Sequence, residues 1–166
     1  ENSNKYLTQV AATLNNQTNL QENTNELQEA GKAYKEALQI YRKLAEENPN
    51  KFLPDVAMTL NNLTVLQGDT NELLEAEKTY KEALQIRRKL AEENPNKFLS
   101  NVSMTLNNLA NLQVNTNELH EAEKAYKEAL KINRTLAKEN PNKFLPEPAT
   151  NINRPANLKC ESNEMY

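Results

Sequence analysis

The heptapeptide ENPNKFL occurs three times in this chain, beginning at Glu47, Glu93 and Glu139, always 46 residues apart. A near copy, ENSNKYL, begins at Glu1. Aligning the chain with itself at this shift gives three complete units and a partial fourth: residues 5–50, 51–96, 97–142 and 143–166. The second and third units are identical at 33 of 46 positions. Such a period predicts one repeat domain over residues 1–166, in which each unit stacks on the next.

Each unit has the sequence pattern of two helices. In the second unit, Pro54 suits the first turn of a helix and Asp55 suits its positive end. The side chains expected on the buried stripe of this first helix follow at helical spacing: Val56, Leu60, Leu63 and Gln67.

The second helix of the unit carries a longer apolar stripe. On the outer face Glu77 precedes Lys81 by four residues, a spacing that favours an ion pair along a helix. The stripe itself is expected to consist of Leu73, Ala76, Tyr80, Ala83, Leu84, Ile86 and Leu90.

Asparagine and proline mark the breaks between helices. Asn71, like Asn25 and Asn117 in the other units, is expected in the left-handed backbone region, which Asn tolerates better than most residues. Pro95 is expected to end the second helix, because proline cannot continue it and restricts the residue before it. The apolar pair Phe52 and Leu53 is then expected in the connector between hairpins.

These residues resemble a known family. Leu60, Leu63 and Thr64, followed by Ala76, Tyr80 and Ala83, are similar to the tetratricopeptide repeat. The phrases TLNNL and EAEKAYKEAL resemble its long-helix subclass, found in kinesin light chains. The resemblance implies an all-α solenoid of antiparallel helical hairpins and a non-catalytic protein-binding scaffold. The unit departs from the family length of about 34 residues because its second helix is longer.

The resemblance also implies a binding site, because first helices in this family line a concave groove that takes peptides. Amide side chains there offer donors and an acceptor to a peptide backbone of any sequence. The pattern leaves open that they are simply solvent-facing polar residues. The residues expected on this face are Asn15, Asn16, Asn19, Met58, Asn61, Asn62, Val65, Met104, Asn107, Asn108 and Asn111.

Composition narrows the partner to a protein or an extended peptide. The net charge of -3 lacks the positive field that nucleic acid requires, and no apolar run is long enough for a membrane span. No base stands at the matching first-helix positions, so the family's clamp for C-terminal carboxylates is not expected. A single cysteine, Cys160, excludes an internal disulfide framework and fits a cytoplasmic location.

Catalysis has little support in the sequence. No catalytic triad, glycine-rich phosphate loop or metal-ligand spacing occurs, so neither enzyme activity nor a cofactor or metal is expected. The one histidine, His120, falls at the start of an expected exposed helix. Arg87, Arg88 and Lys89 predict a short basic patch that is not repeated in the third unit, where Asn133 and Thr135 replace two of the three, which argues against phosphate binding.

The ends of the array suggest an alternative function. Gln17 replaces the core leucine in the first unit, and Pro155 stands at that place in the fourth. A short, broken closing segment over residues 143–158 is therefore expected, followed by a disordered end. If this cover is poor, the last hairpin exposes an apolar face. The chain would then be a structural segment: a spacer in a longer array, or a homo-oligomer through stacked ends.

Overall fold

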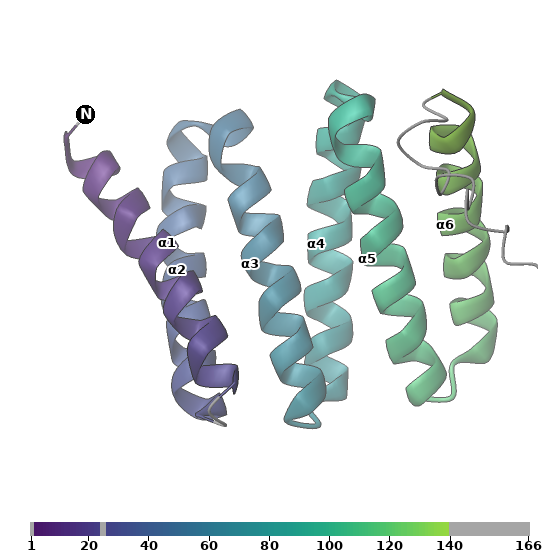
Figure 1. Ribbon diagram of the computed structural model, residues 1–166, viewed down its shortest axis with the longest axis horizontal. Coiled ribbons are helices and arrows are strands. Elements are labelled where there is room, and N and C mark those ends of the chain that lie inside the picture. The colour runs from purple at the N-terminus through teal and green to yellow at the C-terminus, as the bar shows by residue number, and fades with distance from the viewer. Residues whose placement is uncertain (1, 24–25, 140–166) are drawn as a thin grey trace, which may run out of the picture.

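The computed structural model describes residues 2–23 and 26–139, and within them the chain is all helical (Figure 1). The expected all-α class is therefore confirmed. The helices are α1 (Asn2–Asn23), α2 (Leu27–Glu47), α3 (Pro49–Asp69), α4 (Leu73–Glu93), α5 (Pro95–Asn115) and α6 (Leu119–Glu139).

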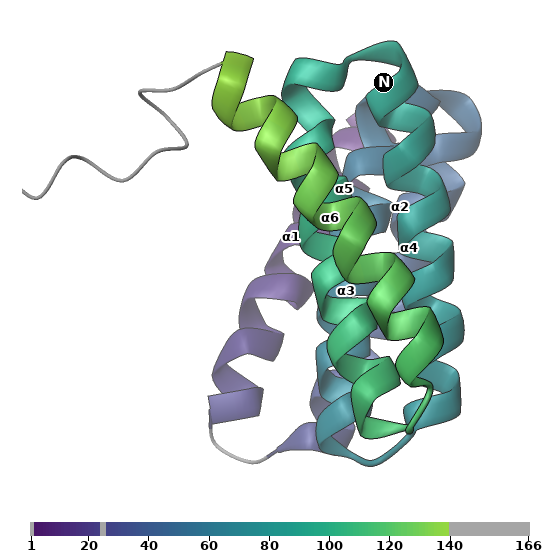
Figure 2. The same ribbon diagram turned by 90° about the vertical axis from the view of Figure 1, so that its right-hand side faces the viewer.

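The six helices form a row of antiparallel hairpins. Each helix packs against its neighbours in the sequence, and α1 and α6 lie at opposite ends of the row (Figure 1). Seen from the α6 end, α1, α3 and α5 lie on one side and α2 and α4 on the other (Figure 2). The first helices of the three hairpins therefore share one side of the molecule, which we call the first-helix face.

A single residue joins one hairpin to the next. Asn48 lies between α2 and α3, and its backbone N–H donates to the Leu44 carbonyl oxygen at 3.0 Å. Its side-chain oxygen accepts a hydrogen bond from the Lys51 backbone N–H at 3.3 Å, which caps the next helix. Pro49 occupies the first turn, where its missing N–H is no loss. Asn94 does the same between α4 and α5.

The predicted connector around Phe52 and Leu53 was wrong. Because Asn48 closes one helix and caps the next, α3 begins at Pro49 and already contains both residues. Phe52 is buried in the core. Pro54 lies inside the helix, and Asp55 is consequently too far from its start to benefit from the positive end.

The turns inside the hairpins follow the prediction. Asn71 and Asn117 adopt φ angles of 62° and 64°, in the left-handed region. The Glu72 backbone N–H then closes the turn by donating to the Gln67 carbonyl oxygen at 2.8 Å. Asn25, the equivalent in the first unit, lies outside the described residues.

The apolar stripes form the core as expected. Val56, Leu60, Leu63 and Gln67 are all buried on α3. On α4, Ala76 and Ala83 are fully buried and bring neighbouring helices close, while the Tyr80 ring, 6% exposed, fills the space between them. The expected pair on the outer face is also present, with Lys81 Nζ 2.6 Å from a Glu77 carboxylate oxygen.

The tyrosine of the last hairpin is less well covered. Tyr126 is 38% exposed, because in the described part of the chain α6 has a neighbouring hairpin on one side only. Its hydroxyl donates to the side-chain oxygen of Asn111. The expected closing segment, residues 143–158, and the tail after it lie outside the described residues.

We predict that Tyr80→Ala lowers the free energy of unfolding by about 3–5 kcal/mol, because it leaves a cavity at a closely packed site. Tyr126→Ala, the matched change in the next unit, should cost clearly less, because that ring is already partly in water. Urea denaturation of the two variants measures both losses. A loss below roughly 1 kcal/mol for Tyr80→Ala, or equal losses, would contradict this account of the core.

Candidate functional site

Two hollows lie between α3 and α5 on the first-helix face. The larger has a volume of about 340 Å³ and is floored by residues of α4. The smaller, of about 210 Å³, lies between the C-terminal halves of the same two helices. The larger hollow is lined by Pro54, Asp55, Ala57, Met58, Asn61, Asn62, Arg87, Leu90, Phe98, Asn101 and Met104.

The structure brings most of the predicted site residues to these hollows. Met58, Asn61, Asn62 and Met104 line the larger one. The smaller one is lined by three more predicted residues: Val65, Asn108 and Asn111.

The remaining predicted residues are more scattered. Asn16 is exposed on α1, and Asn107 is half-buried on α5. The side chain of Asn19 lies outside what the structure describes. The first unit therefore adds less to the site than the second and third.

Asn15 corrects the prediction, because it is buried rather than displayed on the face. Its side-chain nitrogen donates to the Thr59 hydroxyl at 3.0 Å, and that hydroxyl donates to the Asp55 carbonyl oxygen at 2.9 Å. The first amide of this Asn–Asn pair thus turns toward the next unit. Its equivalent Asn61 is half-buried, and its side-chain oxygen is buried without a hydrogen-bond partner.

Arg87 is the site residue that the sequence prediction missed. Only 4% of it is exposed, and it lines the larger hollow from α4. One guanidinium nitrogen donates to the Asn101 carbonyl oxygen at 3.1 Å and to the Thr105 hydroxyl. Within the described residues Arg87 makes no ion pair with a carboxylate. It is therefore a buried cation without a neutralising partner there.

The expected basic patch does not exist as one surface. Arg87 points inward, whereas Arg88 pairs with Glu128 across the outer side at 2.7 Å. Helical spacing could have revealed this, because Arg87 comes three residues after Leu84 and three before Leu90, on the buried stripe.

Burial shifts the pKa values of ionisable groups around the hollow. It lowers the pKa of the Arg87 guanidinium and raises the pKa of the Asp55 carboxyl, which nearby Lys51 partly offsets. The pKa of Tyr41 is raised by burial and then by the negative charge of Asp55. The larger hollow thus presents polar groups in a poorly solvated setting, where a well-placed partner gains more than at an open surface.

The described residues offer little else for chemistry. No cluster of three or more His, Cys, Asp or Glu residues within ranges 2–23 and 26–139 could hold a metal ion. His120 is exposed on α6, as expected. In the same ranges, no helix combines the length and the apolar character that crossing a membrane requires.

Stacked antiparallel hairpins that bury apolar residues at each junction and display first helices on one side define an α-solenoid repeat protein. A family model for the tetratricopeptide repeat matches residues 56–96 and 102–142. The second and third units of the chain are therefore tetratricopeptide repeats, which serve in general as scaffolds for protein interaction.

Comparison with solved structures agrees with this assignment. The crystal structure of BtubC (BKLC) from P. vanneervenii is similar, with 26% sequence identity and a TM-score of 0.67. The match covers 84% of this chain and 50% of that one, so this chain spans about half the length of BtubC. The resemblance to the kinesin light chain-like subclass is confirmed by these matches. No curated protein matches the chain.

We predict that Asp55→Asn stabilises the fold at neutral pH. Folding raises the pKa of this carboxyl, so the ionised form destabilises the folded state at any pH above that value. The third unit already has Asn101 at this position. The gain should shrink as the pH falls and vanish below the ordinary carboxyl value of 3.8, where Asp55 is protonated in both states.

Thermal melts from acid to neutral pH measure this difference, with Glu46→Gln on the exposed face of α2 as the control. A gain that is independent of pH, or one that the control reproduces, would show that Asp55 is not held in a desolvated site.

Proposed function

We propose that the chain is a non-catalytic scaffold that binds an extended segment of a partner protein along its first-helix face. The observation that carries the proposal is the gathering of amides and methionines around the two hollows between α3 and α5. Asn62 and Met58 come from the second unit, and Asn108 and Met104 from the third, so one segment crossing the hollows would meet both units.

The chemistry of the larger hollow suits a peptide backbone. Asn61 and Asn62 line it with half-buried side-chain amides, which can pair with both the N–H and the C=O groups of a peptide. Arg87 supplies a buried donor on the floor of the same hollow, toward a carbonyl or carboxylate oxygen. Met58 and Met104, both exposed, are flexible apolar side chains that adapt to different ligand surfaces.

A cytoplasmic location remains part of this proposal. With a single cysteine, the chain cannot form an internal disulfide, which fits a reducing compartment.

The test uses a peptide selected for binding to the full chain from a random displayed library. We predict that Asn62→Ala together with Asn108→Ala weakens its binding roughly tenfold, because each truncation removes hydrogen bonds to the ligand backbone. Fluorescence anisotropy with the labelled peptide measures the affinity. Amide chemical shifts should change on α3 and α5 and stay constant on the outer faces of α4 and α6.

The matched control replaces Asn50 and Asn96, which are exposed, lie in the first turns of α3 and α5 and are related by the same 46-residue shift. It should leave both the affinity and the melting temperature unchanged. If the Asn62 and Asn108 variant keeps full affinity, or if the shifts map to α2 and α6 and leave α3 and α5 unchanged, the first-helix face is not the binding site.

A further inference from the structure

The interface between successive hairpins occurs twice in the molecule. Between α2 and α3, Phe52 and Val56 join the buried cluster that contains Tyr34 and Leu38. Between α4 and α5, the equivalent cluster joins Val102 and Leu106 to Tyr80 and Leu84. A second helix thus always packs its Tyr–Leu pair against the start of the next first helix.

Both halves of this same interface are displayed at the ends of the row. On α1, Tyr6 and Val10 stand at the positions of Phe52 and Val56, and Tyr6 is 64% exposed whereas Phe52 is 4% exposed. On α6, Tyr126 and Leu130 stand at the positions of Tyr80 and Leu84, and they too are exposed. Each end therefore presents the surface that the other end is shaped to cover.

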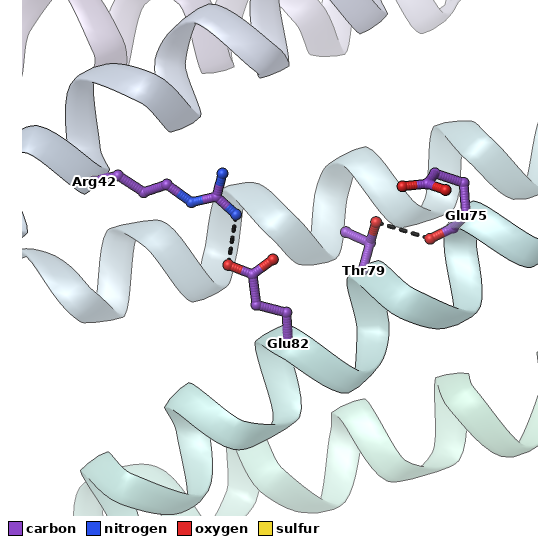
Figure 3. Close-up of polar contacts among 4 residues, drawn as sticks. All are labelled: Arg42, Glu75, Thr79 and Glu82. Atoms are coloured by element: carbon purple, nitrogen blue, oxygen red, sulfur yellow. Dashed lines mark hydrogen bonds and ion pairs between the residues drawn. The ribbon is translucent and has the colours of Figure 1, made fainter.

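An ion pair between the second helices of successive hairpins is also repeated along the row. Arg42 on α2 reaches the Glu82 carboxylate on α4 at 2.5 Å (Figure 3). One unit later, Arg88 on α4 pairs with Glu128 on α6 at 2.7 Å. The hydrogen bond from the Thr79 hydroxyl to the Glu75 carbonyl oxygen in Figure 3 is local to α4 and does not link units.

The two ion pairs belong to a series of arginines and glutamates that recur every 46 residues. The next arginine in the series is Arg134 on α6, and the preceding glutamate is Glu36 on α2. Both side chains are exposed, and neither forms an ion pair with any residue in the described ranges. The end faces are therefore complementary in charge as well as in apolar shape.

We propose that copies of this chain associate head to tail, with α1 of one copy docking on α6 of another. Tyr126 and Leu130 then cover Tyr6 and Val10 of the second copy, and Arg134 pairs with its Glu36. This contact joins two different surfaces, so it adds copies in one direction instead of closing a symmetric dimer. It is independent of peptide binding and leaves the first-helix face open along the stack.

A second copy fits this face better than the chain's own fourth unit, judged by sequence. The fourth unit has Pro148 at the position of Val102 and Pro155 at that of Leu109, and proline disrupts a helix at interior positions. Helix α1 keeps a valine, Val10, at the first of these places.

The test is sedimentation velocity of the full chain over a dilution series. The average mass should rise with concentration from 18.9 kDa and pass the mass of a dimer. Arg134→Glu and Glu36→Arg should each weaken association roughly fivefold, because each places like charges across the contact. Mixing the two variants should restore association, because both junctions of a mixed stack then join opposite charges.

The controls are Lys89→Glu and Glu46→Arg, which make the same charge changes at exposed positions that the proposed contact does not include. They should associate like the unchanged chain. Val10→Lys should abolish growth while leaving the melting temperature of the monomer unchanged, because Val10 is already exposed in the monomer.

Four results would overturn the proposal. These are a monomer at every concentration, a mass that stops at the dimer, equal association of the charge variants, and a mixture that fails to recover. If the full chain stays monomeric and only a variant lacking residues 140–166 associates, the occupant of α6 is the chain's own tail and not a second copy.

Discussion

The structure depends on one seam, in which the second helix of each hairpin packs its alanines and tyrosine against the first helix of the next. A lone hairpin cannot bury its apolar stripe, so the seam supplies the core that each unit lacks. The single residues Asn48 and Asn94 set its geometry. Each of them ends one helix and caps the next, so the connection between hairpins is only one residue long.

The face that we propose as the binding surface is a consequence of this seam. Because the seam stacks the second hairpin against the third, α3 and α5 lie side by side and leave two hollows between them. Side chains of the first helices that do not pack in the seam, such as Asn62 and Met58, line these hollows, where we propose that they contact a ligand. Asn15 is not displayed in this way, because its amide donates to Thr59 and joins two first helices, α1 and α3. At the two ends of the row, the residues of α1 and α6 that correspond to the two sides of this seam are exposed.

Periodicity revealed the fold but not the boundaries of its helices. The 46-residue shift and the apolar spacing were sufficient to place Tyr80, Ala76 and Ala83 in the core, and both turn asparagines in the left-handed region. The start of α3 was misplaced because proline was taken as a stop, although Pro49 is equally suited to a first helical turn.

The site was only partly predictable for a different reason. The rotation of each helix relative to its neighbour decides which of two adjacent amides is displayed on the first-helix face. The sequence pattern leaves that rotation uncertain by about one residue, or 100°. Arg87 was assigned to the surface by its charge, although its spacing places it on the buried stripe.

Native-state hydrogen exchange tests the shared seam most directly, at a concentration where the chain is monomeric. If each hairpin is stabilised by its neighbours, the amides of α3 and α4, which have a hairpin on both sides, should exchange most slowly. Those of α1 and α6 should exchange fastest. Equal protection in all six helices, or the strongest protection in α6, would contradict a stack held together by contacts between neighbouring units.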